Sequence, residues 1–391
     1  MIHDLAHYDM SEARGYLCAH NPANVELSGD MARARDVAMR LPDFMPTGRV
    51  RALLERDLPL PDMDAELAGM TDPEIRMAMV HYSFMVQAYV WGEAEAASRL
   101  PACLAVPMVA LADHLGQQPL LPYSGYVLDN WGMFDEGGGI DLDNIFMIQN
   151  FLAGQDEAWF VLVHVAIEAR AGEALALMKP IVEAAGAGDV DAARKGLEQT
   201  ARVWGDINAI FDRMPERCDP YVYYNRVRPY IHGWKDNPAL PNGVIYEGVE
   251  RYGSEAQAFR GQTGSQSSIV PAMDALLGIG HAADPLREYL DQLHIYRPTS
   301  HRRFIDDVRA ASRLRGFVTE SRDEGLTRAY NSVVQAVADF RTRHLEYAAS
   351  YINKQGLSGA GNDTEVGTGG TPFMRYLKKH RDETAANLIA L

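Results

Sequence analysis

One histidine lies on an otherwise apolar face of a predicted long helix. Apolar and aromatic residues recur there at steps of three and four, which is the spacing of a buried helix face. His344 occupies one position of this face, and a buried imidazole needs a partner for its ring. The spacing leaves two interpretations: a core histidine hydrogen-bonded to a neighbour, or an axial ligand of a haem iron. The face comprises Leu326, Tyr330, Val333, Val337, Phe340, His344, Tyr347 and Tyr351.

A second histidine, His164, lies in the apolar segment 160–168. This segment predicts a buried helix with one ionisable residue pointing inward. His164 and Glu168 are four residues apart, a spacing that could serve a metal site. No third ligand is apparent, so a metal site is disfavoured against a core histidine that is hydrogen-bonded to Glu168.

The spacing of apolar residues predicts an almost entirely helical chain with few strand signals. Ser321 and Glu324 predict a capping box before the helix of His344. Thr71, Asp72 and Pro73 predict the start of another helix. We expect helices at about 31–41, 48–57, 72–98, 101–115, 143–170, 173–186, 189–214, 220–232, 268–279, 284–294, 300–312, 322–355 and 371–390.

Three segments rich in glycine, proline or asparagine interrupt these helices. Segment 119–139 predicts a connection between a smaller N-terminal domain, residues 1–140, and a large helical domain, residues 141–391. The second interruption is 237–268. The third, 355–371, has six glycines and is either a surface loop or a lid over a site. It lacks the Gly-Lys-Ser/Thr of a phosphate loop, so we do not expect nucleotide binding.

Composition and charge narrow the classes of partner. The chain has 391 residues, of which 47% are hydrophobic, and a net charge of −16. A field of that sign repels phosphate backbones and anionic lipid, so neither nucleic acid nor membrane is an expected partner. Three cysteines without a CxxC pair indicate a reducing compartment. With no export signal and no long apolar run, we expect a cytoplasmic protein.

Seven short strings add a more specific signal. They are YSGYVLDNW at 123–131, RPYIHGWKDNP at 228–238, YEG at 246–248, QSS at 266–268, DALLGI at 274–279, RTRHL at 341–345 and GTGGT at 367–371. In this order and at this spacing they resemble the indoleamine 2,3-dioxygenase family of haem enzymes, from about residue 100 to residue 377. The resemblance implies an all-α fold: a large helical haem-binding bundle with a smaller, mainly helical N-terminal domain.

The resemblance assigns residues to the cofactor, which would be haem b with dioxygen as co-substrate. His344 matches the proximal histidine that ligates the iron. Arg341 matches the arginine that pairs with a haem propionate, and its fork of N–H donors suits a carboxylate. Asp274 matches an aspartate near that pair, and Thr263 is also expected at the cofactor.

The resemblance also assigns residues to an indole or tryptophan substrate. Arg228 matches the arginine that binds the substrate carboxylate, because a fixed cation offsets the cost of desolvating that group. Thr368 matches the threonine of a mobile loop that closes over the amino-acid end. Tyr224 and Arg228 would share one helix face, and tyrosines replace the usual phenylalanines at 223 and 224. The pocket is expected to include Tyr123, Tyr126, Val127, Phe160, Val161, Tyr223, Tyr224 and Gly264.

His164 departs from the family pattern, since many members carry a small residue such as serine there. A distal imidazole could orient the indole N–H, as in the related tryptophan 2,3-dioxygenases. It could equally donate a hydrogen bond to iron-bound oxygen. We therefore expect a dioxygenase that opens the indole C2–C3 bond of L-tryptophan to give N-formylkynurenine, with His164, Arg228 and Thr368 as catalytic residues. The alternatives are a monooxygenase of a substituted indole and a non-catalytic haem sensor or carrier. The oligomeric state stays open.

Overall fold

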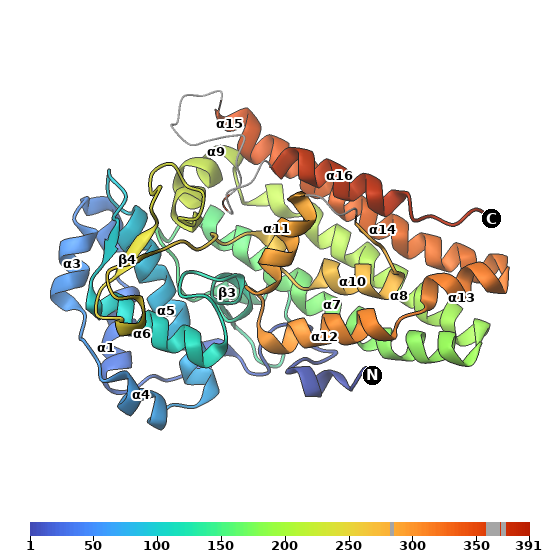
Figure 1. The fold of residues 1–391 in the computed structure, drawn as a ribbon, viewed down its shortest axis with the longest axis horizontal. Helices are drawn as coiled ribbons and strands as arrows, with labels where there is room; N and C mark the ends of the chain where they lie inside the picture. Colours follow the sequence, from blue (N-terminus) through green and yellow to red (C-terminus); the bar gives the residue numbers. More distant parts are fainter. Residues whose placement is uncertain (282–284, 357–367, 369–372) are drawn as a thin grey trace.

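Long helices dominate the structure and confirm the all-α prediction (Figure 1). The computed structural model describes residues 1–281, 285–356, 368 and 373–391. The helices of the first 115 residues gather at one end of the molecule, and the long helices of the second half run away from them (Figure 1). Within the described residues, none of the helices has the length and apolar character needed to traverse a bilayer.

The N-terminal part is built around one buried helix, α5 (Asp72–Trp91). Its start confirms the predicted cap, because the backbone N–H of Thr71 donates to the Glu74 carboxylate over 2.7 Å. Every residue from Met77 to Val90 is buried, which marks α5 as a core helix. Shorter helices surround it: α1 (Gly29–Ala38), α2 (Leu41–Phe44), α3 (Val50–Asp57), α4 (Met63–Gly69) and α6 (Ala102–Leu115).

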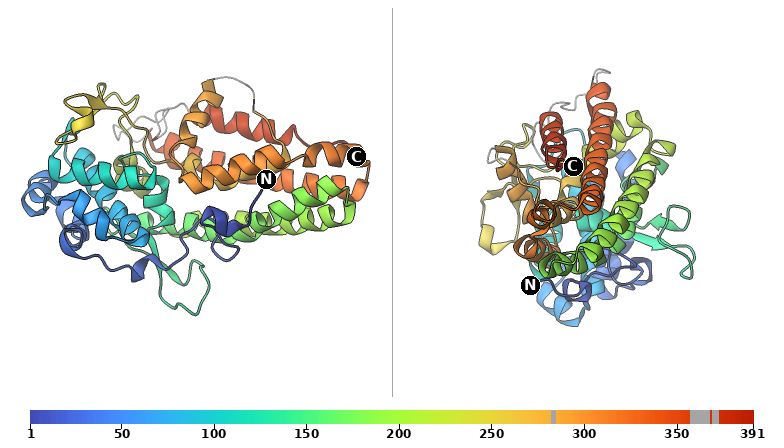
Figure 2. Two further views of the ribbon diagram at one scale, coloured as in Figure 1. Left: turned by 60° about the horizontal axis from the view of Figure 1, so that its bottom comes forward. Right: turned by 90° about the vertical axis from the view of Figure 1, so that its right-hand side faces the viewer.

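The C-terminal part is a layered array of helices. α7 packs on α8, α8 on α14, and α14 on α16, so that long helices lie side by side (Figure 2). The bounds are α7 (Gln155–Ala187), α8 (Val190–Asp212), α9 (Pro220–Val222), α10 (Ile269–Leu277), α11 (Pro285–His294), α12 (Thr299–Ala311), α13 (Leu314–Ser321), α14 (Glu324–Ala348), α15 (Lys354–Gly356) and α16 (Phe373–Ala385).

Short strands join segments that are far apart in the sequence. In one sheet, Leu100 pairs with Tyr246 in parallel, and Val244 pairs with Gln257 in antiparallel orientation. In the other, Trp131 lies opposite Met147. The strands are β1 (Arg99–Leu100), β2 (Trp131–Met133), β3 (Ile145–Met147), β4 (Val244–Tyr246) and β5 (Ala256–Gln257).

The predicted helices at 143–170 and 173–186 were wrong in their bounds. They form one helix, α7, which begins only after Gly154 and continues through Gly172. Residues 145–147 form β3 instead. The loop that follows β3 is fixed by the Glu157 carboxylate, which accepts the backbone N–H groups of Phe151 and Leu152 over 2.8 and 3.1 Å.

The predicted capping box at Ser321 and Glu324 was also wrong. Ser321 is the last residue of α13, a helix that the sequence pattern did not predict. The N-cap of α14 is Asp323, whose carboxylate accepts the backbone N–H of Leu326 over 2.7 Å. Both side chains are good caps, and the one nearer the helix start satisfies the exposed N–H groups.

The predicted helix at 220–232 is broken into three short turns. α9 is followed by a π-helical turn, η6 (Tyr223–Val227), and by a 3₁₀ turn, η7 (Arg228–Ile231). Pro229 cannot donate a backbone hydrogen bond, which disfavours a continuous helix.

The first part of segment 119–139 lies in the interior of the protein. Its residues 120–132 are all buried and include a π-helical turn, η4 (Ser124–Leu128). Its proposed role as a domain connection, like the division at residue 140, stays a prediction. Of the predicted lid at 355–371, residues 357–367 and 369–371 lie outside the described residues.

A close crossing of the N-terminal segment over α7 explains why α7 carries a glycine in its interior. A Cβ on Gly172 would lie 2.2 Å from the carbonyl oxygen of Glu12, and one on Gly15 would lie 2.0 Å from that of Glu168. Gly15 also has a positive φ of 57°, which side chains disfavour. The two glycines let the backbones touch at the turn of α7 that carries Glu168.

We predict that Gly172→Ala lowers the free energy of unfolding by about 1–3 kcal/mol, because the added methyl group meets backbone rather than a movable side chain. Gly205→Ala is the matched control. Gly205 is exposed within α8, and its Cβ would meet nothing within 4 Å. The control should be neutral or stabilising by up to about 1 kcal/mol. Equal effects of both variants in urea unfolding would contradict the close crossing.

Candidate functional site

Two histidines from different helices face a shared hollow between α7 and α14. His164 and His344 both line two adjoining cavities in this region. The ring of Phe211, from α8, lies between them, 6.5 Å from the His164 ring and 6.4 Å from the His344 ring. The structure therefore brings together the two histidines that the sequence singled out.

The environment of His344 keeps its imidazole neutral. Burial lowers its pKa to about 4, and the nearby His164 ring and Arg341 guanidinium add to the shift. No hydrogen bond to its ring is found within the described residues. A neutral imidazole with a free lone pair is the form that ligates a metal.

His164 has a defined tautomer. Its Nδ1–H donates to the carbonyl oxygen of Phe160 over 2.7 Å, so the neutral ring carries its lone pair on Nε2. Burial lowers the pKa of His164 and favours this neutral form, although the hydrogen bond to Phe160 opposes the shift. The expected alternative, a core histidine bonded to Glu168, was wrong because Glu168 has other partners.

Glu168, one turn after His164 on α7, belongs to a buried polar cluster on the wall of the larger cavity. One of its oxygens accepts hydrogen bonds from the Tyr123 and Ser267 hydroxyls over 2.8 and 2.7 Å. Burial raises the pKa of Glu168 to about 7, and these two donors only partly oppose the shift. The sequence drew attention to Glu168 only as a possible metal partner, and no metal-ligand group in the described chain contains it.

Arg341 and Asp274 form a buried ion pair on the wall of the larger cavity. The Arg341 guanidinium donates to both oxygens of Asp274, over 2.7 and 3.2 Å, and to Thr384. His281 lies 3.1 Å from Asp274 on its other side. Burial alone would raise the pKa of Asp274, but these two cations outweigh it and hold the pKa at about 2. Arg341 has two further N–H groups not used within the described chain.

Arg228 is fully buried and lies next to aromatic residues of η6. Its guanidinium carbon is 5.5 Å from the centre of the Tyr224 ring, in keeping with the predicted shared face. Tyr223 lines the cavity, and its ring centre lies 4.6 Å from that of Phe160. The positive charge of Arg228 opposes the rise in the pKa of Tyr223 that burial causes.

Thr368 is held against the cavity by backbone contacts. Its hydroxyl donates to the carbonyl oxygen of Gln262 over 2.6 Å, and its own carbonyl accepts from Gly233 N–H over 3.3 Å. A Cβ on Gly261 would lie 2.2 Å from Gly233 N and 2.5 Å from Thr368 O. Glycines at 233 and 261 thus let three segments meet beside the cavity.

The predicted site residues fall into two groups. Those that line one or both cavities are Tyr123, Phe160, His164, Tyr223, Thr263, Gly264, Asp274, Arg341, His344 and Thr368. Those that are buried but absent from the walls of these two cavities are Tyr126, Val127, Val161, Tyr224 and Arg228.

The sequence missed several residues of the cavity walls. Phe211 is an ordinary apolar position of α8, so nothing marked it. Arg297 matched no motif, but it is buried and donates to the carbonyl oxygens of Ser265 and Ser267 over 2.7 and 3.2 Å. It thereby holds the loop that carries the Ser267 partner of Glu168.

The cavities fit a haem. The fit rests on three features: a neutral histidine with no ring hydrogen bond in the described part of the chain, apolar walls such as Phe211 and Leu377, and a cation with spare donors at one edge. An iron ligand, a dry face and a carboxylate partner are what a haem requires.

The all-helical fold and the histidine-lined cavity agree with the haem-binding bundle that the sequence motifs imply. A family model described as indoleamine 2,3-dioxygenase matches residues 4–387. The chain belongs to the indoleamine 2,3-dioxygenase family. Membership makes it an enzyme, so the interpretation as a haem sensor or carrier is set aside.

Relatives from animals and fungi are similar over nearly the whole chain. Human indoleamine 2,3-dioxygenase 2 is 32% identical over 403 residues, which covers 98% of this chain and 95% of the human protein. Rat indoleamine 2,3-dioxygenase 1 is 33% identical over 368 residues, covering 90% and 88% of the two chains. The Saccharomyces cerevisiae indoleamine 2,3-dioxygenase is 30% identical over 429 residues, covering 98% and 93%.

We predict that Glu168→Gln makes the protein less sensitive to rising pH. The folded state holds the Glu168 proton up to a pKa of about 7, against 4.5 for the free side chain. Stability therefore falls as pH rises from about 4.5 to about 7, by up to about 3 kcal/mol. Glutamine still accepts from Tyr123 and Ser267 but does not titrate.

Relative to wild type, the Glu168→Gln variant should gain stability between pH 5 and pH 8 in urea unfolding. Glu320→Gln, at an exposed position of α13, is the control and should show no such gain. A stability difference between Glu168→Gln and wild type that stays constant with pH would contradict the assignment.

Proposed function

We propose that the protein is a haem b enzyme that opens the indole C2–C3 bond of L-tryptophan with dioxygen to give N-formylkynurenine. The observation that carries the proposal is the pair of neutral imidazoles, His164 and His344, that line the same two adjoining cavities in a chain of this family. When bound to His344, haem supplies the activation of dioxygen for insertion into the indole ring.

In this proposal His164 positions the indole. Its Nδ1–H is held by Phe160, so Nε2 is the acceptor available to the indole N–H. The aromatic walls Phe160 and Tyr223 suit the flat faces of an indole ring. Fixing the ring in one orientation converts binding energy into rate.

Arg228 and Thr368 hold the amino-acid end of the substrate in this proposal. A buried guanidinium matches a carboxylate by charge and geometry. Arg228 lines neither cavity, so side chains of the wall must move for the carboxylate to reach it. Thr368, docked on Gln262, offers a hydroxyl on the cavity wall.

On the cofactor side, the proposal gives Arg341 the pairing with a haem propionate. Asp274 holds that guanidinium in place through two hydrogen bonds. Thr263, whose hydroxyl accepts from Ser265 N–H, shapes the loop at the cavity edge.

A second candidate is the insertion of one oxygen atom into a substituted indole. His164 and the Tyr223 hydroxyl favour it, because they make the cavity more polar than one lined by serine and phenylalanine. The two reactions differ in the number of oxygen atoms that reach the product.

The test is aerobic turnover of L-tryptophan by the haem-loaded protein under reductant and labelled dioxygen. Wild type should give N-formylkynurenine with two labelled atoms. Arg228→Met should raise the KM for tryptophan by about 100-fold, since a buried charge pair lost at one partner costs 2–5 kcal/mol. Arg226→Ala, two residues earlier and exposed, is the matched control and should match wild type.

Three outcomes would contradict this account. One labelled atom in the product would favour the monooxygenase. No product from fully haem-loaded protein would exclude tryptophan as substrate. Equal KM values for Arg228→Met and Arg226→Ala, with an unchanged haem spectrum, would remove Arg228 from the substrate site.

A further inference from the structure

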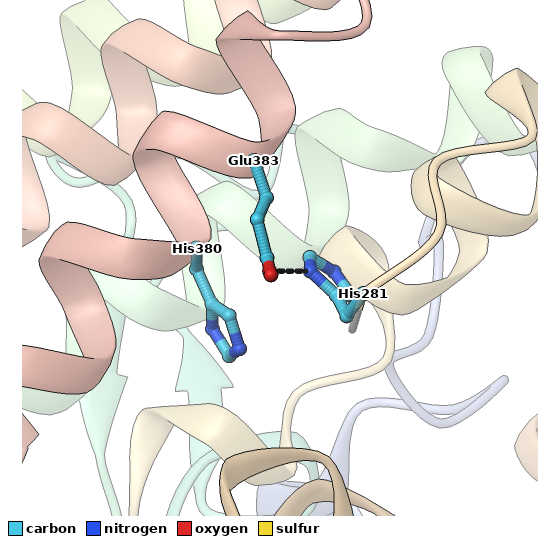
Figure 3. A group of neighbouring side chains, drawn as sticks. All are labelled: His281, His380 and Glu383. Carbon is cyan, nitrogen blue, oxygen red and sulfur yellow. Dashed lines mark hydrogen bonds and ion pairs between the residues drawn. The ribbon is translucent and has the colours of Figure 1, made fainter. Parts of the chain in front are cut away.

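Two histidines and a glutamate lie together at the C-terminal helix, outside the residues that the proposed reaction uses. His380 and Glu383 are three residues apart on one face of α16, and His281 follows α10 (Figure 3). One potential ligand atom from each residue lies within 4.8 Å of the others. Figure 3 shows the three side chains pointing toward one another.

The three side chains are close enough to share one ion once the hydrogen bond between His281 and Glu383 opens. His281 Nδ1 and Glu383 Oε2 are 2.6 Å apart, and the His281 and His380 ring centres are 4.6 Å apart. His380 is only 9% exposed, and its Nε2 is buried without a hydrogen-bond partner in the described chain. A buried polar atom without a partner calls for an explanation such as an unseen ion.

Asp274 is placed to hold the His281 ring in position, as carboxylates do behind metal-binding histidines. The other ring nitrogen of His281, Nε2, lies 3.1 Å from Asp274 Oδ2. Metal-binding histidines typically donate their second N–H to a carboxylate, which fixes the ring and makes it a better ligand. The His281 ring therefore lies between two carboxylates, Glu383 and Asp274. The His380 ring lies beside His281.

We propose that His281, His380 and Glu383 bind a divalent transition-metal ion of the zinc type. Two imidazoles and one carboxylate are a ligand set that zinc uses, with a fourth position left for water or an anionic oxygen. On binding, the ion replaces the proton shared by His281 and Glu383, which leaves to solvent.

The charges around the cluster permit a dication. Glu383 and Asp274 supply two negative charges, and Arg341 offsets one of them through its pairing with Asp274. Lys379 lies 3.4 Å from Glu383, but its side chain is 31% exposed and can turn to solvent. His281 and His380 both line the larger cavity, so the ion would lie in its wall, on the side of Asp274 and Arg341.

The experiment is calorimetric titration of chelator-treated, haem-loaded protein with ZnCl₂, because a filled cavity keeps zinc away from His344. We expect one ion per chain. His380→Gln and Glu383→Gln should each weaken binding at least about tenfold. His114→Ala is the control: this histidine also lies near a carboxylate, Asp72, at 3.5 Å, but has no further ligand, so binding should be unchanged.

X-ray absorption at the zinc edge gives an independent readout. The wild-type spectrum should show two imidazole ligands, and His380→Gln should show one. The proposal is overturned if wild type binds no zinc at micromolar concentration. It is equally overturned if both variants bind zinc as wild type does, or if the bound zinc has no imidazole ligand. The unfolding midpoint and haem spectrum of each variant show that its fold is intact.

Discussion

Desolvation of the hollow between α7 and α14 is the constraint on which the rest of the site depends. Both imidazoles are half-buried, and the partial loss of water makes their charged forms costly, so the neutral forms are favoured. A neutral ring can ligate a metal or accept a hydrogen bond, which are the roles proposed for His344 and His164. The same burial raises the pKa of the Glu168 carboxyl on the adjoining wall. One physical effect thus sets the protonation of three groups around a single cavity.

Two polar groups line the larger cavity beside its apolar residues. In one, the Glu168 cluster is held by Tyr123, Ser267 and the loop that Arg297 fixes. In the other, Asp274 joins Arg341 to His281. Close backbone crossings at Gly172 and Gly261 hold the walls in place. The site is therefore built from contacts between segments that are far apart along the chain.

The sequence predicted the helices and the two histidines because periodicity and motifs are local. It predicted α14 and its apolar face, which is buried from Leu326 to Val337 and half-buried at His344, but misplaced the helix start by choosing Ser321 over Asp323. It grouped His164 with Glu168 by spacing along one helix, whereas the structure pairs them with Phe160 and with Tyr123. Phe211, Arg297 and the cluster at His380 depend on contacts between elements, which no local pattern reports.

The central claim is that His344, and not His164, is the ligand of the iron, although both face the same cavity. The most direct test is the absorbance spectrum of ferrous, haem-loaded His344→Gly beside that of His164→Ser. We predict that His344→Gly loses the histidine-ligated spectrum and regains it with added imidazole, while His164→Ser keeps the wild-type ligation. A wild-type spectrum in His344→Gly, or loss of ligation in His164→Ser, would contradict the account.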